Sequence, residues 1–174
     1  MKKSGTKFFT IRDITIIAAL AAILFVQEEA LTFLPNIQLT VMLIVLYSKC
    51  LGFSKTTAII IIHVILDNLI MGSFNLFYMP FMLIGWLMIP LLLCTVFKKV
   101  SATIPLGLLG ILFSLLYSWI FIIPGVLITK VNLIAYISSD IPFELLLSAS
   151  SFLSILLLYE PLKKVMDKML HSHD

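Results

Sequence analysis

Long apolar runs separated by short polar segments dominate the sequence. Six such runs can be distinguished, at residues 14–34, 37–51, 56–71, 77–97, 104–128 and 141–158. A helix that crosses a membrane needs about 20 mainly apolar residues. We therefore predict an all-α chain, an integral membrane bundle of six transmembrane helices in a single domain over residues 1–174. The second and third runs are short, so these helices could be tilted or could lie partly in a loop.

The basic residues lie in alternate connections between the apolar runs. Lys130 is on one side of the predicted membrane, and the other eleven are on the opposite side: Lys2, Lys3, Lys7, Arg12, Lys49, Lys55, Lys98, Lys99, Lys163, Lys164 and Lys168. Cytoplasmic connections of membrane proteins carry the excess of Lys and Arg. We therefore expect both the N and the C terminus in the cytoplasm, in a multi-pass protein of the cell membrane, of the bacterial cytoplasmic type.

The composition agrees with a membrane protein. The 174 residues are 61% hydrophobic and 12% charged, whereas soluble domains have about 45–50% apolar and about 25% charged residues. The Ala19-Leu20-Ala21 triplet resembles a signal-peptidase site, but it follows Arg12 too closely to leave an apolar region before it, so we expect no cleavage. Cys50 and Cys94 are expected to be free thiols, and the sequence has no metal-ligand spacing.

The ends of the sixth run carry signals for the start and the end of a helix. Asp140 is a suitable N-cap, and Pro142 would then lie in the first turn. Pro161 is expected to end the same helix soon after Glu160. The three predicted outer connections are residues 28–38, 72–76 and 129–140.

Polar side chains within the predicted spans are candidates for a binding site, because an unpaired polar group in lipid costs several kcal/mol. On the third span, His63 and Asp67 lie one turn apart on one face, and Asn68 follows. They could contact a ligand or relay protons, or they could pair internally and hold the helix against its neighbours. For His63 the internal role is favoured, because it lies deeper than the other two.

Further candidates lie on the sixth span and in the outer connections. One face of the sixth span carries Glu144, Ser148 and Ser151. Glu144 is at a depth that suits a polar ligand. For the two serines, hydrogen bonds between helices are favoured, because serine commonly forms them. Trp86 lies near the middle of its span, where it could stack on a planar ligand or pack in the core. The other candidate ligand contacts have side chains with hydrogen-bonding ends: Asn36, Asn75, Tyr78, Asn132 and Tyr136.

No catalytic pattern emerges from the sequence. It contains no HExxH, no hydrolase serine motif and no glycine-rich phosphate loop. We therefore expect a chain that is not an enzyme, binds no cofactor, metal or nucleic acid, and does not hydrolyse ATP by itself.

Several segments, in order and in place, resemble those of a known family. They are the small-residue run AALAA at 18–22, FLPNIQL at 33–39, DIPFELL at 140–146 and LYEPL at 158–162. With the six-span layout and the small size, they make the chain similar to the substrate-binding membrane subunits (S-components) of energy-coupling factor (ECF) vitamin transporters, which are ABC transporters.

The resemblance implies high-affinity capture of a vitamin or related micronutrient at the outer face of the membrane. It also implies docking of the first span, through Ala18 and Ala22, onto a transmembrane coupling (T) subunit driven by two cytoplasmic ATPases. Ala19 and Ala21 would widen this small-residue patch. An alternative is a small proton-coupled secondary carrier that uses His63 and Asp67, although such carriers usually show internal repeats that this sequence lacks.

Overall fold

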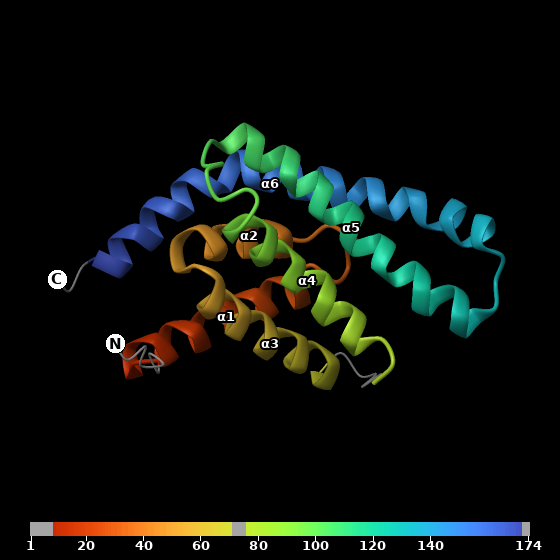
Figure 1. Cartoon of the computed structure of the whole chain (residues 1–174), viewed down its shortest axis with the longest axis horizontal. Coiled ribbons are helices and arrows are strands. Elements are labelled where there is room, and N and C mark those ends of the chain that lie inside the picture. Colours follow the sequence, from red (N-terminus) through yellow and green to blue (C-terminus); the bar gives the residue numbers. More distant parts are fainter. Residues whose placement is uncertain (1–8, 71–75, 172–174) are drawn as a thin grey trace, which may run out of the picture.

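The computed structural model describes residues 9–70 and 76–171, which form six helices and no strand (Figure 1). The helices are α1 (Ile11–Ala30), α2 (Thr40–Leu51), α3 (Phe53–Ile70), α4 (Met79–Cys94), α5 (Thr103–Thr129) and α6 (Leu133–His171). The prediction of an all-helical chain with six helices is therefore confirmed. Three of the described helices, α3, α5 and α6, are long and apolar enough to cross a membrane.

Helix α2 lies in the centre of the bundle. It contacts all five other helices, and its residues from Thr40 to Ser48 are all buried. A helix that is hydrophobic on every side is expected inside a bundle, which explains why α2 has no polar face. At 12 residues it is short, in agreement with the sequence, and its position shields it from the surroundings of the bundle.

Helices α5 and α6 pack closely along their length and extend beyond the other helices (Figure 1). Two glycines of α5 allow the close approach. A Cβ atom at Gly107 would lie 3.0 Å from the Phe152 ring, and one at Gly110 would lie 2.6 Å from Ile155 Cδ1. Nearby, Ser114 Oγ and Ser151 Oγ are hydrogen-bonded at 2.7 Å.

Two sequence signals for α6 were wrong. The helix begins at Leu133 rather than after Asp140, and it continues through both Pro142 and Pro161. Asn132 provides the N-cap, because its Oδ1 accepts a hydrogen bond of 2.9 Å from Ile134 N, as short polar side chains commonly do at this position. The connection that was predicted at residues 129–140 therefore consists only of residues 130–132. Each proline leaves one backbone carbonyl unbonded, which bends a helix without necessarily ending it.

Helix α1 also differs from its predicted range. It begins one turn earlier, where Thr10 and Asp13 form a capping box, and it ends at Ala30, so Glu28 and Glu29 belong to the helix. The connection to α2 consists of residues 31–39.

The basic ends of several helices meet on one side of the bundle. Lys55 Nζ lies 2.5 Å from Asp13 Oδ1, which links α3 to α1. Arg12 donates a hydrogen bond of 2.7 Å to the carbonyl of Leu170 near the end of α6. Lys49 donates to the carbonyl of Phe97, 2.9 Å away, beyond the end of α4. These contacts place the start of α1 and the end of α6 together (Figure 1).

Candidate functional site

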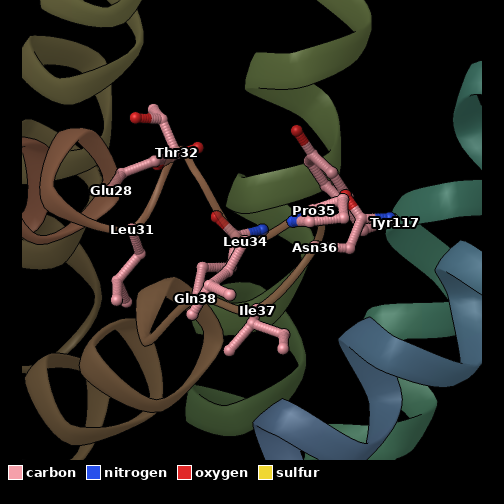
Figure 2. Close-up of a pocket in the computed structure, with 9 residues that line it drawn as sticks. All are labelled: Glu28, Leu31, Thr32, Leu34, Pro35, Asn36, Ile37, Gln38 and Tyr117. Atoms are coloured by element: carbon pink, nitrogen blue, oxygen red, sulfur yellow. The ribbon is translucent and has the colours of Figure 1, made fainter.

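A cavity with two compartments lies beside the α1–α2 connection. The first compartment, of about 320 Å³, is lined by Glu28, Leu31, Thr32, Leu34, Pro35, Asn36, Ile37, Gln38 and Tyr117 (Figure 2). The second, of about 290 Å³, is lined by Asn36, Gln38, Tyr117, Ser118, Phe121, Tyr136, Asp140 and Leu147. Because Asn36, Gln38 and Tyr117 line both, the compartments adjoin. Each is at the lower end of the sizes typical of small-molecule sites, about 300–1,000 Å³.

The second half of the connection is fixed to α6. Asn36 Nδ2 donates a hydrogen bond of 3.1 Å to the carbonyl of Phe143. The backbone N–H of Gln38 donates to the Ser150 hydroxyl at 3.1 Å, and this hydroxyl donates to the backbone carbonyl of Gln38 at 2.9 Å. Asn36 has a φ of 56°, in the left-handed region that Asn adopts more readily than most residues. The first half carries the strongly exposed Phe33, and it is bonded to the end of α1, where the Thr32 hydroxyl donates to the carbonyl of Glu29 at 2.8 Å.

A polar network joins α1 to the start of α2 behind the first compartment. Gln27 Nε2 donates to Thr40 Oγ1 at 2.8 Å, and Gln27 Oε1 accepts from Leu39 N at 2.9 Å. Thr40 Oγ1 in turn lies 3.3 Å from Glu28 Oε2 and 3.0 Å from Gln38 Oε1. These bonds satisfy polar groups in a partly buried place, where each unpaired group would cost about 1–3 kcal/mol.

The network continues to a close contact between α1 and α3. His63 Nε2 lies 3.2 Å from Glu28 Oε2, and the His63 side chain is fully buried. Asp67, one turn further along α3, interacts electrostatically with Glu28, Glu29 and His63. The ring thus connects the cavity wall to the interior of α3.

Tyr117 forms the shared wall of the two compartments and rests on an aromatic stack. Its ring lies 3.8 Å from that of Trp86, centroid to centroid, with 20° between the planes. Gly85 permits this approach, because a Cβ atom there would lie 2.7 Å from Tyr117 Cδ2. The fully buried Trp86 therefore fixes Tyr117 from behind.

The second compartment has two further aromatic walls. Phe121 stacks on Tyr78, with centroids 6.3 Å apart and 15° between the planes. Tyr136 donates a long hydrogen bond of 3.4 Å to the carbonyl of Phe121. Its ring occupies the space that a side chain at Gly125 would need. Asp140 provides the carboxylate of this compartment.

The structure brings several predicted site residues to this cavity. Asn36 and Tyr136 line it directly. Trp86 and Tyr78 lie one layer behind, each stacked on a lining ring. Asp67 does not line the cavity, but it interacts with Glu28, which does. Ligand contact by any of them stays a prediction.

The remaining predicted site residues have other neighbours. Asn68 donates to the carbonyl of Val64, 2.8 Å away, and lies 3.4 Å from Met82 Sδ. Asn132 caps α6 and Ser151 bonds to Ser114. Glu144 interacts with Asp140 and Trp119 beside the cavity. The last candidate, Asn75, is outside the described residues.

Sequence reasoning missed Tyr117 and Glu28 as cavity residues. Tyr117 lies within a long apolar run, where an aromatic residue is most simply read as core. Glu28 lies within the first predicted run, at residues 14–34, and nothing in the local sequence links it to α3. Gly85 on α4 is a signal that could have helped, because small residues in apolar helices let a neighbouring helix approach closely.

The predicted docking residues Ala18 and Ala22 are exposed on α1. Ala19 is exposed next to them, whereas Ala21 is fully buried. The expectation that Ala21 widens the patch is therefore wrong, because it lies on the opposite, core-facing side of the helix with Ile17 and Leu24. Ala22 also borders a shallow apolar hollow with Ile23, Val26, Gln27 and Ala30.

The cavity offers carboxylate, amide, hydroxyl and aromatic groups, which together can hold a small polar molecule by hydrogen bonds and stacking. Within residues 9–70 and 76–171, no three His, Cys, Asp or Glu side chains converge to form a possible metal site. Comparison of the chain with known protein families, with curated proteins and with solved structures finds no match to any of them.

Proposed function

We propose that this chain is the substrate-binding subunit of an ECF-type transporter and captures a vitamin or related micronutrient at the outer face of a cell membrane. The six helices would all cross or enter the membrane, with both termini in the cytoplasm. ATP hydrolysis would occur in two partner ATPases, coupled through a transmembrane T subunit. The observation that carries this proposal is the cavity of aromatic and polar groups at one end of an apolar helical bundle.

The distribution of charge supports the proposed orientation. Arg12, Lys49 and Lys55 contact groups at the end of the bundle where α1 begins. The cavity is formed where α1 ends and α2 begins. Since basic residues mark the cytoplasmic side, the cavity would open towards the outside.

The exposed alanines of α1 support the proposed docking. Ala18 and Ala22 are one turn apart, and neither is covered by another helix of this chain. In lipid, helices associate largely through close packing, and small residues let two backbones approach. A T subunit packed here would leave the internal face of α1, with Leu20 and Leu24, undisturbed.

The test of this function combines identification of the ligand with uptake. Small molecules released from the detergent-purified chain are identified by mass spectrometry, and their uptake is measured in cells that carry the whole transporter. Depletion of ATP with an intact proton gradient should stop uptake. Continued uptake would exclude ATP-driven import.

The second candidate function is a proton-coupled carrier. It is favoured by one observation, the fully buried His63 beside Glu28 and within electrostatic range of Asp67. In such a carrier, collapse of the proton gradient at constant ATP would stop uptake, and His63→Gln would uncouple substrate movement from protons. The same uptake experiment therefore separates the two functions.

A further inference from the structure

The charged residues that line the cavity are acidic. Glu28 lines the first compartment and Asp140 the second, and the described lining of both contains no Lys, Arg or His. An anion bound in either compartment would meet a charge of its own sign, while a cation would meet the opposite sign. At the low dielectric of a partly enclosed site, this difference is larger than in water.

The surroundings of the cavity increase the excess of negative over positive charge. Glu29 and Asp67 lie within electrostatic range of one another beside Glu28, and Glu144 interacts with Asp140. In the described part of the chain, the basic groups near this end are His63, which contacts Glu28, and the exposed Lys130 at the end of α5. The carboxylates thus outnumber the basic groups around the cavity.

Glu28 has a carboxylate oxygen available for a ligand. Both of its described contacts, with Thr40 Oγ1 and His63 Nε2, are made by Oε2. Its Oε1 has no hydrogen-bond partner among the described residues. Glu28 is therefore held in place through one oxygen, while the other can accept a hydrogen bond in the cavity that it lines.

The aromatic walls favour a flat ligand with positive charge. Tyr117 lines both compartments and is held from behind by Trp86. Tyr117 shares the lining of the first compartment with Glu28 and that of the second with Asp140, so its ring and these carboxylates border the same space. Phe121 and Tyr136 add rings to the second compartment. A cation close to an aromatic face gains about 0.5–2 kcal/mol, depending on its exposure to water.

We propose that the cavity binds a small planar organic cation, such as an N-alkylated or protonated nitrogen heterocycle. Its ring contacts Tyr117, and its positive charge lies near Glu28 or Asp140. The amides of Asn36 and Gln38, which line both compartments, bond to its polar substituents. This inference rests on the proposed function and names the chemical class of the captured nutrient.

The test compares three quinoline probes of similar size but different charge at neutral pH: 1-methylquinolinium, neutral 4-methylquinoline and anionic quinoline-4-carboxylate. Binding to the full detergent-purified chain is measured by calorimetric titration. We expect the cation to bind at least tenfold more tightly than the neutral probe, and the carboxylate to bind most weakly. Glu28→Gln and Asp140→Asn, which remove charge without changing shape, should each reduce the preference for the cation at least threefold.

Glu160→Gln is the matched control. It removes the same charge at the opposite end of α6, where Glu160 accepts a hydrogen bond from Thr103 and Gln can still accept it. This variant should keep the full preference for the cation. If Glu160→Gln loses the preference for the cation as strongly as the cavity variants do, the preference comes from general attraction by net charge. That result would overturn the proposed site.

Other results would overturn the inference in different ways. Tighter binding of the neutral or anionic probe, or a cation preference that survives both cavity substitutions, refutes the cationic class. A neutral or anionic nutrient that co-purifies and is imported with ATP would leave the proposed function standing. If none of the three probes binds and no molecule co-purifies, both the class and the proposed function fail.

Discussion

Replacement of Gly85 by alanine tests whether the stack of Tyr117 on Trp86 shapes the cavity. The added Cβ would lie 2.7 Å from Tyr117 Cδ2 and 3.1 Å from Cε2, whereas carbon atoms in contact prefer about 3.5–4.0 Å. The ring must therefore move by about 1 Å. It cannot do so without disturbing a stack whose centroids are 3.8 Å apart, and such pairs contribute about 0.5–1.5 kcal/mol beyond their buried area.

We expect Gly85→Ala to lower the free energy of unfolding by about 1–3 kcal/mol, as overpacked cores do. Because Tyr117 lines both compartments, ligand binding should weaken at least tenfold, or about 1.4 kcal/mol. Thermal melting in detergent reports the first effect, and titration with the co-purified ligand reports the second.

Gly107→Ala is the matched control for this experiment. Its Cβ would meet the Phe152 ring at 3.0 and 3.1 Å, a similar clash between α5 and α6 that involves none of the residues lining the cavity. It should lower the melting temperature but leave the dissociation constant of the folded protein unchanged. If the two variants weaken binding equally, or if Gly85→Ala binds normally, Tyr117 does not form the ligand wall.

Three further predictions concern the docking patch, the connection and the α5–α6 contact. Ala18→Trp or Ala22→Trp should leave melting and ligand binding intact but abolish assembly with the T subunit and uptake; joint loss of stability and binding would mean internal packing instead. Ligand should protect the connection at residues 31–38, which lines the first compartment, from hydrogen exchange more than residues 98–105, and equal protection would argue against ligand contact by this connection. Ser151→Ala should lower the free energy of unfolding by about 1 kcal/mol without affecting binding, so weaker binding with an unchanged melting temperature would identify Ser151 as a ligand contact.

The number and type of the helices could be predicted from the sequence because each apolar run is bounded by charge, proline or glycine. The limits of α6 could not. Asp140 and Pro142 make a plausible helix start, but Asn132 caps the helix earlier, and a proline within the helix is tolerated along its exposed face. Local signals show at which residues a helix can begin, and tertiary packing decides at which of these residues it does begin.

The candidate site was predictable only in part, for a related reason. Asn36 and Tyr136 are polar residues near helix ends, and the sequence singles them out directly. Glu28 and Tyr117 lie on α1 and α5, which are far apart in the chain, and they line the same compartment only in the folded structure. Contacts of this kind have no local signature, so they emerge from the fold.

The chain is proposed to capture a small molecule in the cavity beside residues 31–38. Native mass spectrometry of the protein released from detergent tests it most directly, with wild type and Asn36→Ala compared. We expect one organic molecule per chain in the wild type and its loss or strong depletion in Asn36→Ala, because the Asn36 side chain lines both compartments. The bare chain mass in the wild type, or equal occupancy in both proteins, would contradict it.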